Sequence, residues 1–142
     1  MGRWVAMAAA LGALILGGCD DLTIPADDRW EAVLESREGF DVQGGAVAHS
    51  APGRNRVTVG VWQAPAGESL PWHIHAGWCE TGGEILGDAA AYPPLEVGAE
   101  GRAESWTTLE YGFQPEQPYH VKVNRAADDL TTVMACGDFV LR

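Results

Sequence analysis

Two histidines and a cysteine lie close together in the stretch LPWHIHAGWCE, residues 70–80. His73 and His75 are two positions apart, and Cys79 follows a few positions later. Imidazole is the commonest protein ligand for metal ions near neutral pH, and it suits copper and zinc. The spacing supports two hypotheses: a metal site, or a strand that carries two polar side chains on its solvent face.

The direction of these side chains depends on the element that carries them. Side chains alternate along a strand, so His73 and His75 would share one face and their apolar neighbours the other. The same alternation in the segment 118–125 places His120 on a polar face, opposite Tyr119. We expect the apolar sets inside and the histidines on the outer face. If the two strands are neighbours, His120 is a third candidate ligand.

The chain shows no other enzyme signature. It has no nucleophile elbow, no phosphate-binding glycine loop and no HExxH motif, so we nominate no catalytic residue. The fourth histidine, His49, stands alone near the end of an expected strand, and we interpret it as a surface or turn residue.

Short β-type runs separated by turn signals make up most of the chain. The segment 30–34 fits a helix or a strand, and we favour the strand because β-type runs follow it. The segment 79–100 is glycine-rich and predicts a long loop with one short helical turn. Seven or eight short strands without a long helix predict an all-β sandwich or small barrel. The expected strands are 30–34, 42–49, 56–63, 70–76, 101–111, 118–125 and 131–142. The expected core is Val57, Val59, Val61, Trp62, Trp72, Ile74, Tyr119, Val121, Val123, Val133 and Met134.

The N-terminus carries a targeting pattern. Arg3 precedes an apolar run that is too short to span a bilayer, and the run ends in Leu16-Gly17-Gly18-Cys19. This ending resembles the lipobox of bacterial lipoproteins. The resemblance implies a signal peptide over 1–18, lipidation of Cys19, a tether over 19–28 and a β-domain over 29–142. An ordinary secretory signal and a retained membrane anchor are the alternatives. We expect a location in the bacterial cell envelope, lipid-anchored, on the periplasmic or cell-surface side.

The charge of the chain narrows the choice of partners. The formal net charge is −11 and the chain has a single lysine, Lys122. A phosphate backbone would be repelled by this charge, so we expect no nucleic-acid partner. The membrane, reached through the lipid anchor, is the partner that the N-terminus predicts.

If Cys19 is lipidated, Cys79 and Cys136 are the two remaining cysteines. In an oxidising compartment they have one intramolecular pairing, and closing so long a loop contributes roughly 4 kcal/mol in the chain-entropy model. Two buried free thiols are the alternative.

The motifs HIHAGWC, AADDL and MACGD, taken in order, resemble the copper-zinc superoxide dismutase superfamily. They are closer to its non-enzymatic relatives, the CHRD-like domains of bacterial secreted proteins and lipoproteins. The resemblance runs from about Trp30 to Phe139. It implies a Greek-key β-barrel of about eight strands, copper ligands at His73 and His75, and a disulfide between Cys79 and Cys136.

The chain departs from that superfamily at three places. In that superfamily a further copper-ligand histidine precedes the ADDL-like turn, and Asn124 occupies that position here. The loop 79–100 contains no histidine, so we expect no zinc site. The segment 131–135 lacks the arginine expected before the last cysteine. We therefore expect a binding or interaction role instead of catalysis, and one hypothesis for it is a copper site formed by His73 and His75, with His120 as a candidate third ligand. A metal-free interaction module and a copper-only dismutase with a reduced site are the alternatives.

Overall fold

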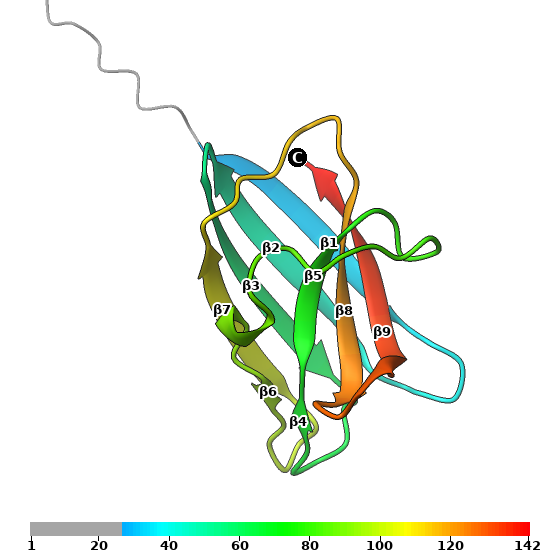
Figure 1. The fold of residues 1–142 in the computed structure, drawn as a ribbon. Helices are drawn as coiled ribbons and strands as arrows, with labels where there is room; N and C mark the ends of the chain where they lie inside the picture. Colours follow the sequence, from blue (N-terminus) through cyan, green and yellow to red (C-terminus); the bar gives the residue numbers. More distant parts are fainter. Residues whose placement is uncertain (1–26) are drawn as a thin grey trace, which may run out of the picture.

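The computed structural model describes residues 27–142, which form a curled β-structure (Figure 1). The predicted signal peptide, the lipidation site Cys19 and most of the tether lie outside the described residues. Within 27–142 there are nine strands and one short 3-10 helix. No helix in this part of the chain is long and apolar enough to cross a membrane. The prediction of an all-β fold is confirmed.

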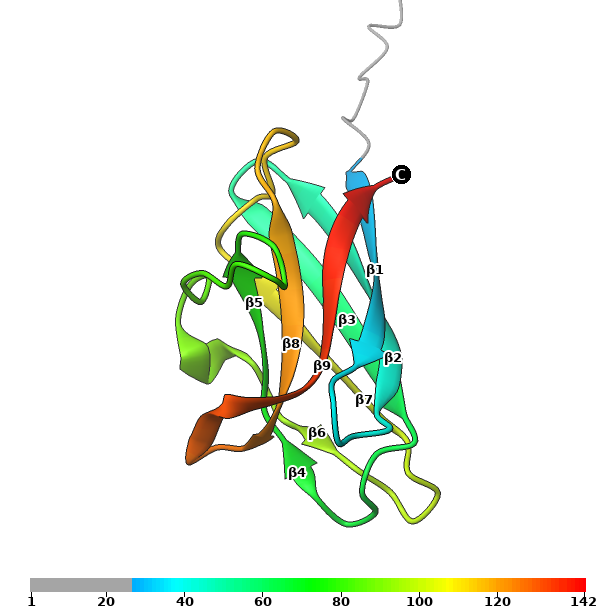
Figure 2. The ribbon, with the colours of Figure 1, turned by 90° about the vertical axis from the view of Figure 1, so that its right-hand side faces the viewer.

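Seven strands form one antiparallel sheet in the order β5-β8-β9-β1-β2-β3-β7, and β4 pairs with β6 separately. The strands are β1 (Asp28–Ser36), β2 (Gln43–Ala51), β3 (Arg54–Trp62), β4 (Ser69–Leu70), β5 (Trp72–Ala76), β6 (Leu95–Glu96), β7 (Ala103–Leu109), β8 (Tyr119–Ala126) and β9 (Asp129–Leu141). The 3-10 helix η1 spans Ala89–Ala91. Two perpendicular views show the sheet curling into a half-barrel (Figures 1 and 2).

The first three strands form a meander, as their sequence predicts. β1 pairs with both β2 and β9, so the segment 30–34 is a strand and not a helix. The turn between β1 and β2 contains Gly39, whose φ of +88° favours glycine. In β3 the valines at 57, 59 and 61 are buried and alternate with Arg56 and Thr58, which gives a half-buried strand its period of two.

The predicted strand 70–76 is divided at Pro71. Leu70 pairs with Leu95 in the small sheet, whereas Trp72 pairs with Val123 in the large one. Proline lacks the N–H group that a continuous ladder needs, and the chain changes sheets there. The carbonyl of Pro71 accepts a hydrogen bond from the backbone N–H of Asn124, at 2.8 Å.

Most of the predicted core is buried. Trp62 is the exception: 42% of its surface is exposed, because it alternates with Val61 onto the outer face. Its indole N–H donates there to Gln43 Oε1 at 3.3 Å. Val133 is only half-buried, and it pairs with Asn124 next to a register shift between β8 and β9.

The two edges of the large sheet meet at one carbonyl oxygen. Pro93 O accepts hydrogen bonds from Trp72 Nε1 of β5, at 2.7 Å, and from Ser105 Oγ of β7, at 2.6 Å. The same segment, which links the edge strands β5 and β7, also contributes Tyr92. Its ring packs edge-on against Trp72, with ring centroids 5.1 Å apart. Side-chain bonds to one loop therefore join the opposite sides of the half-barrel.

Candidate metal centre

The two histidine-bearing strands are neighbours, which is the condition for His120 to be a candidate ligand. β5 and β8 are antiparallel, His75 lies directly opposite His120, and His73 lies opposite Lys122. Directly opposed residues of an antiparallel pair project from the same face. His73, His75 and His120 therefore share one face of the sheet.

The ring geometry distinguishes two of these histidines from the third. The rings of His75 and His120 are stacked, with centroids 5.1 Å apart and planes inclined by 13°. His73 lies 6.2 Å from His75 at 88°, and its ring packs at 5.1 Å from that of Tyr92. The structure thus pairs His75 with His120 and places His73 beside this pair.

Backbone carbonyls fix the tautomer of both paired rings. His75 Nδ1 is 2.9 Å from Gly83 O, and His120 Nδ1 is 2.7 Å from Gly77 O. A carbonyl oxygen can only accept, so each Nδ1 carries the proton and each Nε2 presents a lone pair. Both Nε2 atoms are buried and lack a hydrogen-bond partner among the described residues.

The predicted exposure of this face is wrong. The histidines lie on the face opposite Trp72 and Ile74, as alternation requires, yet His120 is 0% exposed and His73 is 6% exposed. The chain that follows β5 folds back along it: Ala76 N–H donates to Glu84 O at 3.0 Å. The outer face is therefore covered by the chain's own loop instead of solvent.

Sequence reasoning missed the two glycines whose carbonyls hold the rings. Gly77 has a φ of +89°, a conformation that side chains disfavour. At Gly83 an added Cβ would lie only 1.8 Å from Ala76 O, so no larger residue fits the present backbone. The glycine-rich composition of the loop was the available signal, and it indicated a close approach of backbone segments.

A disulfide holds this loop to the far side of β8. Cys79 and Cys136 are bonded, with Cα atoms 6.1 Å apart and a sequence separation of 57, which confirms the predicted pairing. The backbone N–H of Cys79 also donates to Asp138 Oδ1 at 2.7 Å. Cys79 lies between Gly77 and Gly83, so the cross-link fixes the segment that supplies both carbonyls.

Burial keeps the imidazoles neutral. Desolvation lowers the pKa of His75 to about 4, and its hydrogen bond with Gly83 opposes this shift only in part. Desolvation likewise lowers the pKa values of His120 and His73, against the hydrogen bonds with Gly77 and Ala89. The Nε2 lone pairs of His75 and His120 are therefore unprotonated at neutral pH.

Asn124 has a structural place in β8. It is 2% exposed, and its Nδ2 donates to Leu130 O at 2.9 Å, across the β8–β9 turn. It pairs with Val133, whereas His120 pairs with Asp138 further along β9. The amide therefore satisfies a backbone carbonyl at a position where the resemblance would place a metal ligand.

The donor set of this centre is small. Within residues 27–142 no group of three or more His, Cys, Asp or Glu side chains is arranged to hold a metal ion. A structural zinc site needs four ligands, so the paired imidazoles do not fit zinc. They offer two neutral nitrogen donors, shielded from water on a rigid pair of strands.

A comparison of the chain with known proteins found no matching family model and no matching curated protein.

Proposed function

We propose that the protein is a membrane-anchored lipoprotein whose β-domain binds one copper ion through His75 and His120. The observation that carries this proposal is the pair of buried Nε2 atoms without partners. Leaving a buried acceptor unsatisfied costs about 1–3 kcal/mol, so two such atoms on stacked rings need an explanation. A cation between them would satisfy both lone pairs.

Copper fits this donor set better than the other common metals. Cu(II) heads the affinity order of the divalent first-row ions, and Cu(I) accepts two ligands in a linear arrangement. Metal–nitrogen bonds of about 2.0–2.1 Å need Nε2 atoms about 4 Å apart. The ring centroids are 5.1 Å apart. The lone pair of each Nε2 lies in the plane of its ring, and the two planes are inclined by only 13°, so at least one ring must rotate before both nitrogens point at one ion.

His73 has a supporting place in this proposal. Its ring lies edge-on to His75 and packs against Tyr92, so it shields the pair on one side. The resemblance to the dismutase superfamily makes His73 a ligand, and we retain that role as the alternative for a three-coordinate site.

Binding, not turnover, is the activity that we propose for the bound ion. A net charge of −11 repels the superoxide anion, and the segment 131–135 supplies no cation to attract it. The membrane anchor at Cys19 would then hold a copper-binding domain at the envelope surface.

A competition titration tests the proposal. The purified protein is titrated with Cu(I) against a chromogenic chelator, with ascorbate as a reductant that spares the disulfide. We expect one equivalent to bind, and we expect His75→Ala and His120→Ala each to lower the affinity by about 100-fold or more, the equivalent of one lost ligand bond. His49→Ala is the matched control, because His49 is exposed on β2 away from the pair.

The same titration distinguishes the two roles considered for His73, a copper ligand or a residue that only supports the pair. His73→Ala should weaken binding by less than about 100-fold if the residue only supports the pair, because 100-fold is the upper end of the usual range for an outer partner. Absence of a saturable site, or unchanged affinity in His75→Ala, would sink the copper proposal.

A further inference from the structure

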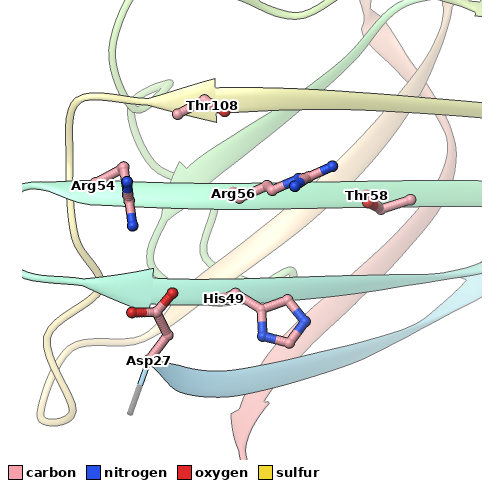
Figure 3. A pocket seen from close by; sticks show the side chains of 6 residues that line it. All are labelled: Asp27, His49, Arg54, Arg56, Thr58 and Thr108. Atoms are coloured by element: carbon pink, nitrogen blue, oxygen red, sulfur yellow. The ribbon is translucent and has the colours of Figure 1, made fainter. Parts of the chain in front are cut away.

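His49 lies outside the proposed copper centre, in a shallow hollow on the outer face of the sheet (Figure 3). It is directly opposite Arg56 of β3, which is directly opposite Thr108 of β7. Arg54 precedes Arg56 by two positions and shares its face. The hollow has a volume of about 560 Å³ and is lined by Asp27, His49, Arg54, Arg56, Thr58 and Thr108.

The two arginines are unusual in so acidic a chain. The sequence has nine Lys and Arg residues against 20 Asp and Glu. The ion pairs among the described residues join Arg29 and Arg142 to Glu31, and Arg37 to Glu80. Within 27–142, neither arginine of the hollow has a carboxylate in ion-pair contact. Two like charges on neighbouring positions of one strand face repel each other, and an anion would relieve this repulsion.

A contact with Trp106 restricts the side chain of Arg56, which lowers the entropy cost of binding an anion. The guanidinium carbon of Arg56 lies 5.5 Å from the centre of the Trp106 ring, a cation–π contact that restricts the side chain. Figure 3 shows the labelled side chains gathered over neighbouring strands, with Asp27 beside the start of β1. Asp27 is the single carboxylate of the lining. The guanidinium fork matches the geometry of phosphate oxygens.

We infer that the arginine face, defined as His49, Arg54 and Arg56, rests on the phosphate groups of lipid headgroups in the membrane. This inference rests on the proposed anchor at Cys19. The eight positions from Cys19 to Asp27 span at most about 26–29 Å, and Asp27 lines the hollow itself. The chain would therefore enter the domain beside the arginine face, within reach of the headgroups.

The open shape favours a surface over a small ligand. His49, Arg54, Arg56 and Thr108 are all exposed, so a free anion would find no enclosure, whereas a bilayer presents many phosphates in one plane. Charges elsewhere on the domain are screened beyond about 8 Å at physiological salt. The two arginines and Asp27 give the lining a net charge of +1, so an anionic surface favours the docked orientation by about fivefold.

Chemical modification of arginine tests this docking in the full chain. The protein is reconstituted into vesicles of zwitterionic lipid, with or without anionic phospholipid, and treated with an arginine-specific dicarbonyl reagent. Peptide mass spectrometry then gives a rate for each arginine. We expect modification of Arg54 and Arg56 to slow by at least fivefold when anionic lipid is present, and to recover at high salt. Arg102 and Arg125, which are exposed and unpaired among the described residues, are internal controls.

The outcomes separate docking from anchoring. A chain that floats with the vesicles while Arg54 and Arg56 react as fast as the controls overturns the docking and leaves the anchor intact. A chain that does not float overturns both. Protection by inorganic phosphate without vesicles would instead show a free-anion site. Energy transfer from the tryptophans to a headgroup dye measures the orientation of the domain. In the double variant Arg54→Gln plus Arg56→Gln, this orientation should no longer depend on anionic lipid. Arg102→Gln plus Arg125→Gln should retain this dependence.

Discussion

His75 and His120 lie directly opposite each other on two antiparallel strands and stack with ring centroids 5.1 Å apart. Each ring is held through Nδ1 by a carbonyl of one short, disulfide-linked loop. This arrangement leaves two buried nitrogens that accept neither a proton from the protein nor, at neutral pH, one from solvent. The first three predictions below follow from it.

Acid should destabilise the fold through this pair. An unfolded histidine has a pKa of about 6.5, and burial lowers that of folded His75 to about 4. Between these values the unfolded state binds more protons, so the contribution to stability is present above about pH 6.5 and is lost as the pH falls towards 4. The slope is at most about 1.4 kcal/mol per pH unit for each proton. Denaturant unfolding at pH 7.5, 6 and 5 measures it. His75→Gln should flatten the curve relative to His49→Gln, and equal slopes would contradict the assignment.

Gly83→Ala should damage both the fold and the site. The new Cβ would meet Ala76 O at 1.8 Å, so the loop must shift and carry the Gly83 carbonyl away from His75. We expect a loss of about 1–3 kcal/mol in unfolding free energy, together with weaker copper binding. Gly60→Ala is the control, because the nearest atom to its Cβ would be Ala103 O, at 3.9 Å. Equal stability of the two variants would show that the loop is not tightly placed.

Removal of the disulfide should lower the free energy of unfolding by more than Gly83→Ala does. The bond between Cys79 and Cys136 closes a separation of 57 residues, and Cys79→Ser plus Cys136→Ser should lose roughly 4 kcal/mol of stability. Copper affinity should fall as well, because the loop that supplies both carbonyls is released. Cys19→Ser retains the disulfide and should unfold as the parent does. Unchanged copper binding in the double variant would mean that strand pairing alone positions the rings.

Asn124→His restores the residue type that the dismutase resemblance expects, and it should not create a ligand. The Asn124 amide is buried and donates to Leu130 O at 2.9 Å. Position 124 is also about 13 Å along β8 from His120. We expect about 1–3 kcal/mol of destabilisation, similar to that of Asn124→Ala, and no gain in copper affinity. A tighter complex with copper would show that the two positions can meet.

Local sequence pattern was enough for most of the strands but not for their environment, and it missed β6, which lies within the predicted loop 79–100. The alternation in RVTVGVWQ predicts β3, and the glycine after Glu38 predicts the turn before β2. The same rule placed Trp62 in the core, although the tryptophan alternates onto the outer face. Pro71 ended a strand that we expected to continue, since one missing N–H allows the chain to leave the large sheet.

The candidate site needed information that no local pattern contains. Period two places His75 and His120 each on a polar face, but their direct opposition depends on the register of β5 against β8. Their burial depends on the path of a glycine-rich loop. The groups that hold the rings are the backbone carbonyls of Gly77 and Gly83, which residue types alone do not reveal. The disulfide was predictable because Cys79 and Cys136 are the one pair that remains once Cys19 is assigned to the expected lipid anchor.

The shared hydrogen-bond acceptor Pro93 O has a further consequence for the protein at high local concentration. Strands at the edges of an open sheet recruit strands from neighbouring molecules, which starts aggregation. Here one edge strand, β5, is occupied by the returning segment around Ile85, and both edges are tied to the chain that passes through Pro93. The chain itself thus occupies the β5 edge, and high local density need not lead to strand addition there.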